Sequence, residues 1–297
     1  MKHNLKITAL LLAMFLVTQL IGIYVVNYYS PEDRVLPFGL DPPQPEQSSD
    51  YTSFFSGIIF AFIIAVLLLF LFTRFKFKFI LKAWFFLVIV LALSISLMAI
   101  LPIKTALISL IIAVPLALAK MFGKNFLVHN FTELFIYPGI AAVFVPILNV
   151  WTIIALLILI SIYDMWAVWH SGIMQKMAKY QIDHLKVFSG FFVPYVSKKV
   201  RQQINKWKSV LTKKQLQKKK IKVNVAILGG GDIVFPIITA GVMLKTLGIW
   251  PAILVVLGAT LGLAYLFFAA EKKKFYPAMP FITAGILAGI LASYLTL

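Results

Sequence analysis

The chain has 297 residues, of which 61% are hydrophobic and 13% are charged, and its mean hydropathy is +0.95. These values exclude an ordinary soluble domain and indicate a polytopic membrane protein. Cysteine is absent, which excludes disulfides, thiolate catalysis and cysteine-ligated zinc or iron–sulfur sites. The four histidines are not spaced as metal ligands, so we expect neither a metal nor an organic cofactor.

Apolar runs divide the chain into nine predicted membrane-spanning helices. The first run is long enough to span and lacks the Ala-x-Ala exit of a signal peptide. The predicted spans cover approximately residues 5–27, 51–73, 83–101, 104–122, 126–148, 151–173, 223–245, 250–270 and 278–297. The sequence therefore predicts an all-α polytopic membrane protein, with one transmembrane domain over residues 1–297.

Basic residues indicate the orientation of these spans. Of the 28 Lys and Arg residues, 14 lie between Lys176 and Lys222, and most others gather at alternate turns on the same side. By the positive-inside rule, the N-terminus and the loop 175–222 are cytoplasmic and the C-terminus is external, in a multi-pass protein of the cell membrane. We expect this loop to lie on anionic lipid headgroups and expect no binding of nucleic acid.

Two acidic residues lie deep inside apolar runs, Asp164 in the sixth predicted span and Asp232 in the seventh. A charge near the bilayer centre costs at least ~2.5–3.5 kcal/mol on insertion scales, so such an acid indicates a functional site. At the helical rise of about 1.5 Å per residue, Asp164 lies about 18 Å from Lys176, and Asp232 about 15 Å from Lys222. The two spans run antiparallel across one loop, so we expect both carboxyl groups at a common depth.

Two carboxyl groups that meet at such a depth share one proton, because both cannot ionise together. The ionised acid then takes a proton from water as the water attacks a peptide carbonyl, and the protonated acid supplies a proton to the developing oxyanion. The same two acids also suit a proton-coupled transporter or ion channel, and a non-catalytic scaffold is a third alternative.

Segments that loosen helical structure surround this predicted pair. Gly229, Gly230 and Gly231 directly precede Asp232, and Pro236 has no N–H to give to the Asp232 carbonyl. We interpret this stretch as a helix weakened on both sides of the acid. The segment 277–280 begins and ends with proline, which favours an extended strip that pairs with an unwound substrate by strand addition.

Three short motifs resemble those of a known family. Tyr163-Asp164, Leu228-Gly229-Gly230-Gly231-Asp232 and Pro277-Ala278-Met279 resemble the Tyr-Asp, Gly-x-Gly-Asp and Pro-Ala-Leu motifs of the presenilin and signal peptide peptidase family, above all its archaeal presenilin homologues. The resemblance implies an intramembrane aspartyl endopeptidase with Asp164 and Asp232 as catalytic residues. Its substrates would be membrane proteins with transmembrane helices and external N-termini. Met279 departs from the family's leucine.

Other residues of these motifs, and two segments outside them, carry further expectations. The resemblance implies that the site is supported by Tyr163, Leu228, Gly229, Gly230, Gly231, Pro277, Ala278 and Met279. Glu133, near the start of the fifth predicted span, is interpreted as an interfacial residue that reaches water. The apolar part of the basic loop, around 185–196, is interpreted as a cover over the cytoplasmic approach to the aspartates.

Overall fold

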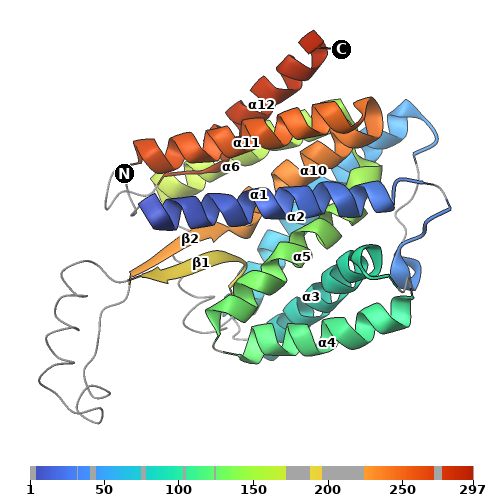
Figure 1. The fold of residues 1–297 in the computed structure, drawn as a ribbon, viewed down its shortest axis with the longest axis vertical. Coiled ribbons are helices and arrows are strands. Elements are labelled where there is room, and N and C mark those ends of the chain that lie inside the picture. Colours follow the sequence, from blue (N-terminus) through green and yellow to red (C-terminus); the bar gives the residue numbers. More distant parts are fainter. Residues whose placement is uncertain are drawn as a thin grey trace, which may run out of the picture.

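The structure, a computed structural model, describes residues 5–31, 33–40, 45–74, 78–102, 105–123, 125–171, 188–195, 224–270 and 276–296. Within these ranges the chain forms nine α-helices and a two-stranded antiparallel sheet (Figure 1). The helices are α1 (Leu5–Tyr28), α2 (Ser48–Arg74), α3 (Lys78–Ile100), α4 (Ala106–Phe122), α5 (Phe126–Phe144), α6 (Val150–Trp166), α10 (Gly230–Leu247), α11 (Ile249–Ala269) and α12 (Met279–Thr296). The strands are β1 (Gly190–Tyr195) and β2 (Asn224–Gly229).

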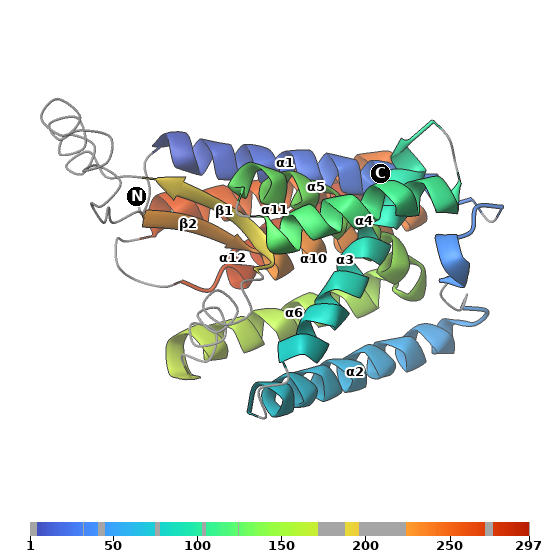
Figure 2. The ribbon, with the colours of Figure 1, turned by 90° about the horizontal axis from the view of Figure 1, so that it is seen from below.

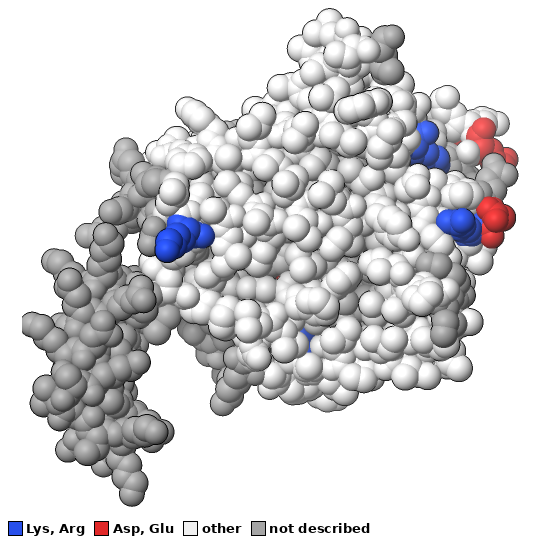
Figure 3. Space-filling model, in the orientation of Figure 1, with Lys and Arg blue, Asp and Glu red and all other residues white. Residues whose placement is uncertain are grey.

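The predicted all-α polytopic membrane fold is confirmed, with the small sheet as an addition. By length and composition, eight of the described helices can cross a membrane, and α4 is an apolar helix of 17 residues. In Figure 3 the broad middle of the visible face carries almost no Lys, Arg, Asp or Glu. Large apolar side chains such as Trp151, Leu261 and Leu295 are largely exposed on the bundle, as expected where lipid is the solvent.

Local sequence signals begin and end several of these helices. Asn149 and Thr152 form a reciprocal cap at the start of α6, and the Asn125 side chain accepts a hydrogen bond from the Leu127 amide at the start of α5. Gly248 links α10 to α11 at a φ of 94°, a conformation that favours glycine. These signals give α10 and α11 a tight antiparallel connection.

The helices pack in two ways. α1, α5 and α10 contact one another in the middle of the bundle, and Leu11, Phe15 and Ile237 are fully buried in their shared core. α11 and α12 approach so closely that a Cβ on Gly258 or Gly285 would collide with the facing backbone. α2 lies apart along one side of the bundle (Figure 2), and none of the residues in its apolar window is buried.

The seventh predicted span, 223–245, is wrong at its start. Residues 224–229 form strand β2, and α10 begins only at Gly230. In β2, Val225 and Ile227 are exposed whereas Ala226 and Leu228 are buried, which is the period-two pattern of a strand. The glycine triplet therefore marks a strand-to-helix junction. It does not lie inside a loosened helix.

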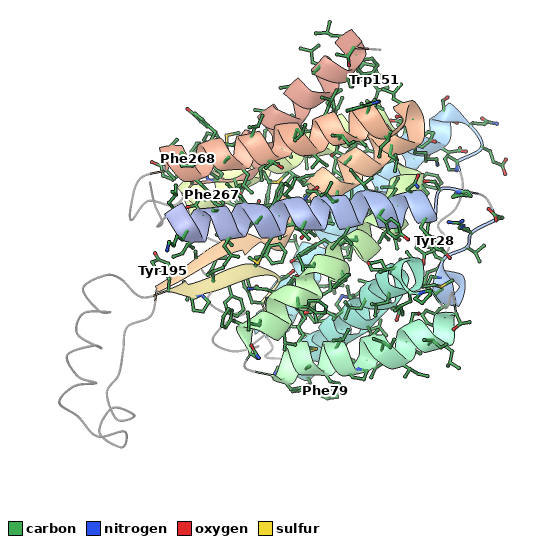
Figure 4. All side chains as sticks on the ribbon, in the orientation of Figure 1. Tyr28, Phe79, Trp151, Tyr195, Phe267 and Phe268 are labelled. Atoms are coloured by element: carbon green, nitrogen blue, oxygen red, sulfur yellow. The ribbon has the colours of Figure 1, made fainter. Side chains whose placement is uncertain are left out.

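The sheet pairs two segments that are distant in sequence. Gly190 faces Gly229 and Tyr195 faces Asn224 in an antiparallel register. Figure 4 shows Tyr195 near the end of the bundle where α1 begins, and Tyr28 and Trp151 near the opposite end. Tyrosine and tryptophan at both ends of a helical bundle are typical of the two membrane–water interfaces.

Candidate active site

Asp164 lies in the last turn of α6 and is only 4% exposed. Its Oδ2 atom accepts a hydrogen bond of 3.0 Å from the backbone N–H of Met279, the first residue of α12, and the backbone of Ala278 also interacts with the carboxyl group. One turn earlier, Ser161 Oγ donates to Thr283 Oγ1 at 2.8 Å. α12 therefore holds the end of α6 through both backbone and side-chain hydrogen bonds. Directly after Asp164, α6 widens into a π-helical turn (Ala167–Ser171).

Asp232 lies in the first turn of α10, immediately after the strand-to-helix junction. Its carboxyl group turns back over Gly229, where an added Cβ would lie 3.2 Å from Oδ2, and it interacts with the Gly229 backbone. Gly229 is the extended residue that precedes the helix. The N-terminal end of a helix carries a partial positive charge, so the junction suits a carboxylate.

Asp164 and Asp232 lie within electrostatic range of each other, because the charge of Asp164 acts on Asp232. Asp164 comes from the end of one membrane helix and Asp232 from the start of another. Asp164 is buried and Asp232 is partly buried. This arrangement brings two acids to one depth at the boundary between helices and the sheet, where they can share a proton.

The other predicted site residues divide into those near the acids and those directed elsewhere. Leu228 is buried on the inner face of β2. Ala278 and Met279 interact with Asp164 through their backbones, and Pro277 is the buried residue that precedes them. The Tyr163 ring packs against Phe62 of α2 and against Trp166, so the structure directs it away from the carboxyl pair.

Glycines 230 and 231 begin α10 and differ in their surroundings. A Cβ on Gly230 would lie 2.7 Å from Ser189 Oγ and 2.9 Å from Tyr137 Oη, so only glycine fits there without a shift of both groups. Gly231 is exposed and has more space.

The predicted extended strip 277–280 is wrong in its second half, because α12 begins at Met279. Pairing of this segment with a substrate stays a prediction. Extended pairing within the described chain occurs at 224–229, where β2 ends at Gly229, three residues before Asp232. Of the basic loop 175–222 only 188–195 lies within the described residues, and Gly190–Tyr195 forms β1 there.

Sequence reasoning missed a buried cluster beside the sheet. Glu133 is not the interfacial residue predicted, since it is 1% exposed and pairs with Lys120 of α4 and with His129 of its own helix. The hydroxyl group of Tyr137, one turn further along α5, interacts with Glu133 and electrostatically with Asp232. The recurrence of His129, Glu133 and Tyr137 every four residues was the available signal, because it places them on one face of a helix.

Comparisons with known proteins agree with this fold. The sequence model of a family described as "Signal-peptide peptidase, presenilin aspartyl protease" matches residues 12–297. One similar solved structure is a presenilin family intramembrane aspartate protease in space group C222, with 20% identity, a TM-score of 0.62, and coverage of 98% of this chain and 99% of that chain. Another, in space group P2, has 21% identity, a TM-score of 0.60, and coverage of 97% of each chain. No curated protein matches the chain.

Proposed function

Because the chain belongs to the signal peptide peptidase and presenilin family of aspartyl proteases, we propose that it is an intramembrane endopeptidase whose catalytic residues are Asp164 and Asp232. The observation that carries this proposal is the electrostatic interaction between two buried or partly buried acids from different membrane helices. Such acids are energetically unfavourable in lipid unless they interact with each other or with a shared water molecule.

In the proposed reaction, the two carboxyl groups hold one proton between them and bind one water molecule. The ionised acid accepts a proton from the water as its oxygen bonds to the peptide carbon, and the protonated acid donates a proton to the carbonyl oxygen. Collapse of the tetrahedral intermediate breaks the C–N bond, and the nitrogen leaves with a proton from the acid pair. The amide of Met279 and the backbone of Gly229 keep the two carboxyl groups in a fixed orientation for both transfers.

The proposed substrates are transmembrane helices of other membrane proteins, which must open locally before a peptide bond reaches the acids. The sheet supports this step. Within the described ranges, β2 has β1 on one side and no strand on the other. An extended substrate segment that pairs with the open side of β2 would run past the junction that carries Asp232.

The proposed orientation places the N-terminus and the loop 175–222 in the cytoplasm, with the loop on anionic headgroups, and the C-terminus outside. Asp164 ends α6 and Asp232 begins α10, so the site lies toward the cytoplasmic part of the bundle in this orientation. By analogy with presenilins, substrates with external N-termini are favoured.

A membrane-inserted substrate tests the proposal. The purified full-length protein, reconstituted in lipid vesicles, should produce two fragments, and Asp164→Asn or Asp232→Asn alone should lower the rate by about 10²–10⁴-fold, since neither acid performs both proton transfers. Asp33→Asn removes a carboxylate from the loop between α1 and α2 and is the control. The rate should also show a bell-shaped dependence on pH.

Two results would contradict the protease. Fragments that persist at the full rate in both asparagine variants would remove the pair from catalysis. Proton or cation flux across sealed vesicles that depends on both acids, with no fragments from several transmembrane substrates, would favour the transporter or channel.

A further inference from the structure

Lys120, His129 and Glu133 form a buried group that the proposed reaction does not use, and we name it the α4–α5 charge cluster. The side chains of Lys120 and Glu133 are 3% and 1% exposed. Glu133 Oε1 pairs with Lys120 Nζ and lies 3.4 Å from His129 Nε2. Burial of two charges is unfavourable unless further hydrogen bonds satisfy them, and apolar side chains of similar volume often pack at least as stably. Helix packing alone therefore does not account for the cluster.

The hydrogen bonds of His129 connect the cluster to strand β1. His129 Nε2 lies 2.9 Å from the carbonyl oxygen of Gly190, which can only accept, so Nε2 carries a proton. His129 Nδ1 lies 3.5 Å from Lys120 Nζ and can then accept from the ammonium group. A neutral imidazole satisfies both contacts, and it joins the ion pair to the first residue of β1.

Asn130, the next residue of α5, forms hydrogen bonds with the backbone of the same strand. Asn130 Nδ2 donates to the carbonyl oxygen of Phe192 at 2.9 Å, and Asn130 Oδ1 accepts from the Phe192 amide at 3.1 Å. The side-chain amide thus takes the place of a neighbouring strand. Together, His129 and Asn130 fix both the register and the depth of β1 against α5.

A second branch reaches the junction itself. Tyr137 Oη interacts with Glu133 and lies 3.4 Å from Ser189 Oγ, and both hydroxyl groups abut the Cα side of Gly230. Since Gly190 also faces Gly229 across the sheet, the two branches converge on Gly229 and Gly230, two of the three glycines that precede Asp232. Glu133 Oε2 is buried, and no described residue donates a hydrogen bond to it.

We propose that Glu133 is a positioning residue for the reaction. Through His129 it fixes strand β1, and through Tyr137 it fixes the glycine junction, so that Asp232 faces Asp164. The inference rests on the proposed function for its catalytic consequence. Its structural content, that hydrogen bonding by residue 133 holds the sheet in place, does not depend on that function.

Two double variants separate hydrogen bonding from charge and from packing. Lys120→Met with Glu133→Gln removes both charges and keeps a polar side chain beside His129 Nε2 and an acceptor toward Tyr137. Lys120→Met with Glu133→Leu removes the charges and the acceptor. Neither leaves a lone buried charge, so both should fold. Thr132→Val, which removes a buried hydroxyl that bonds only to the His129 carbonyl within α5, is the control.

Hydrogen exchange of the full-length protein in lipid nanodiscs is the first measurement. The backbone amides of 190–195 and 224–229 should exchange about tenfold faster in the leucine variant than in the glutamine variant, which is the usual effect of one lost hydrogen bond to a buried partner. Thr132→Val should leave these amides at the wild-type rate. Equal exchange in the two double variants would overturn the proposal.

Cleavage of a membrane-inserted substrate is the second measurement. The leucine variant should show kcat about tenfold below that of the glutamine variant and a wider spread of cleavage sites by mass spectrometry, at equal thermal stability. Equal kcat and equal cleavage sites would refute the positioning role even if exchange differs. If the wild-type protein cleaves nothing, the proposed function fails, whereas the exchange comparison still decides whether Glu133 holds the sheet.

Discussion

The two halves of the candidate site are built by different means. On the Asp164 side, α6 and α12 meet helix to helix, and the carboxyl group receives the amide of Met279 at the start of α12. On the Asp232 side, the carboxyl group stands on a strand-to-helix junction that polar side chains of α5 hold through the sheet. One acid is therefore placed by close helix packing and the other by a network of hydrogen bonds.

This difference in construction indicates which side of the site is able to move. Closely packed helices resist displacement, because their interiors have few alternative arrangements. A two-stranded sheet is marginal by itself and depends on its contacts with neighbouring elements. We therefore expect the Asp164 side to stay fixed in the resting protein, and the Asp232 side to adjust when a substrate adds to β2.

Beyond the two aspartates themselves, the largest expected effect comes from loss of the Met279 amide. Met279→Pro removes the N–H that donates to Asp164, at the first helical residue, where proline is tolerated. Loss of a hydrogen bond to an ionisable group corresponds to about 1.5–3 kcal/mol, so kcat should fall about 10- to 100-fold. Met279→Leu keeps the amide and a similar volume, and should cleave at close to the wild-type rate. Equal rates in the two variants would show that this amide does not serve the site.

An intermediate effect is expected at the junction. Gly230→Ala introduces a methyl group against Ser189 Oγ and Tyr137 Oη and should lower kcat about tenfold, the equivalent of about 1–3 kcal/mol of overpacking. A second change, Ser189→Ala, vacates the nearest contact and should restore part of the rate. Gly231→Ala, with its neighbour at 3.8 Å, is the matched control. If the alanine at 231 is the more harmful of the two, the contacts around Gly230 do not control Asp232.

The smallest effect on catalysis is expected from the packing of α11 on α12. Gly258→Ala meets the backbone of Gly285 and should destabilise the protein by about 1–3 kcal/mol. Gly57→Ala in α2 meets nothing within 4 Å and should be neutral or slightly stabilising. Thermal unfolding in detergent distinguishes the two. If Gly258→Ala does not lower the thermal stability, the close approach of these helices is not needed to hold α12 beside Asp164.

Much of the fold followed from residue patterns alone. Apolar runs and basic turns predicted the membrane class and the nine helices. The helical rise predicted a common depth for Asp164 and Asp232, and in the structure the two acids lie within electrostatic range of each other. These signals are local or depend on simple lengths. The catalytic roles of the two acids stay a prediction, as do the roles of the residues around them.

The sheet and the charge cluster were not predicted, for two physical reasons. β2 is short and joins α10 without a polar linker, so its apolar residues continued the hydropathy of the helix. Its partner β1 begins 34 residues before β2, at Gly190 against Asn224, and a pairing over that separation has no local signature. Glu133 lies close to the start of its predicted span, and this position favoured a prediction that it contacts water. Its burial is a tertiary effect of α4 and β1, which cover that turn.

The abrupt change of backbone at Gly229 and Gly230 has a geometric consequence. Over β2 the chain advances about 3.3 Å per residue, and from Gly230 onward it advances about 1.5 Å. A substrate that lies along α10 and β2 matches their rise per residue only if it changes from helix to extended chain at the same level. The backbone of the enzyme would then determine where the substrate is unwound. The cleavage site would be determined by its distance from this change in rise per residue, and the side chains of the substrate would have a secondary role.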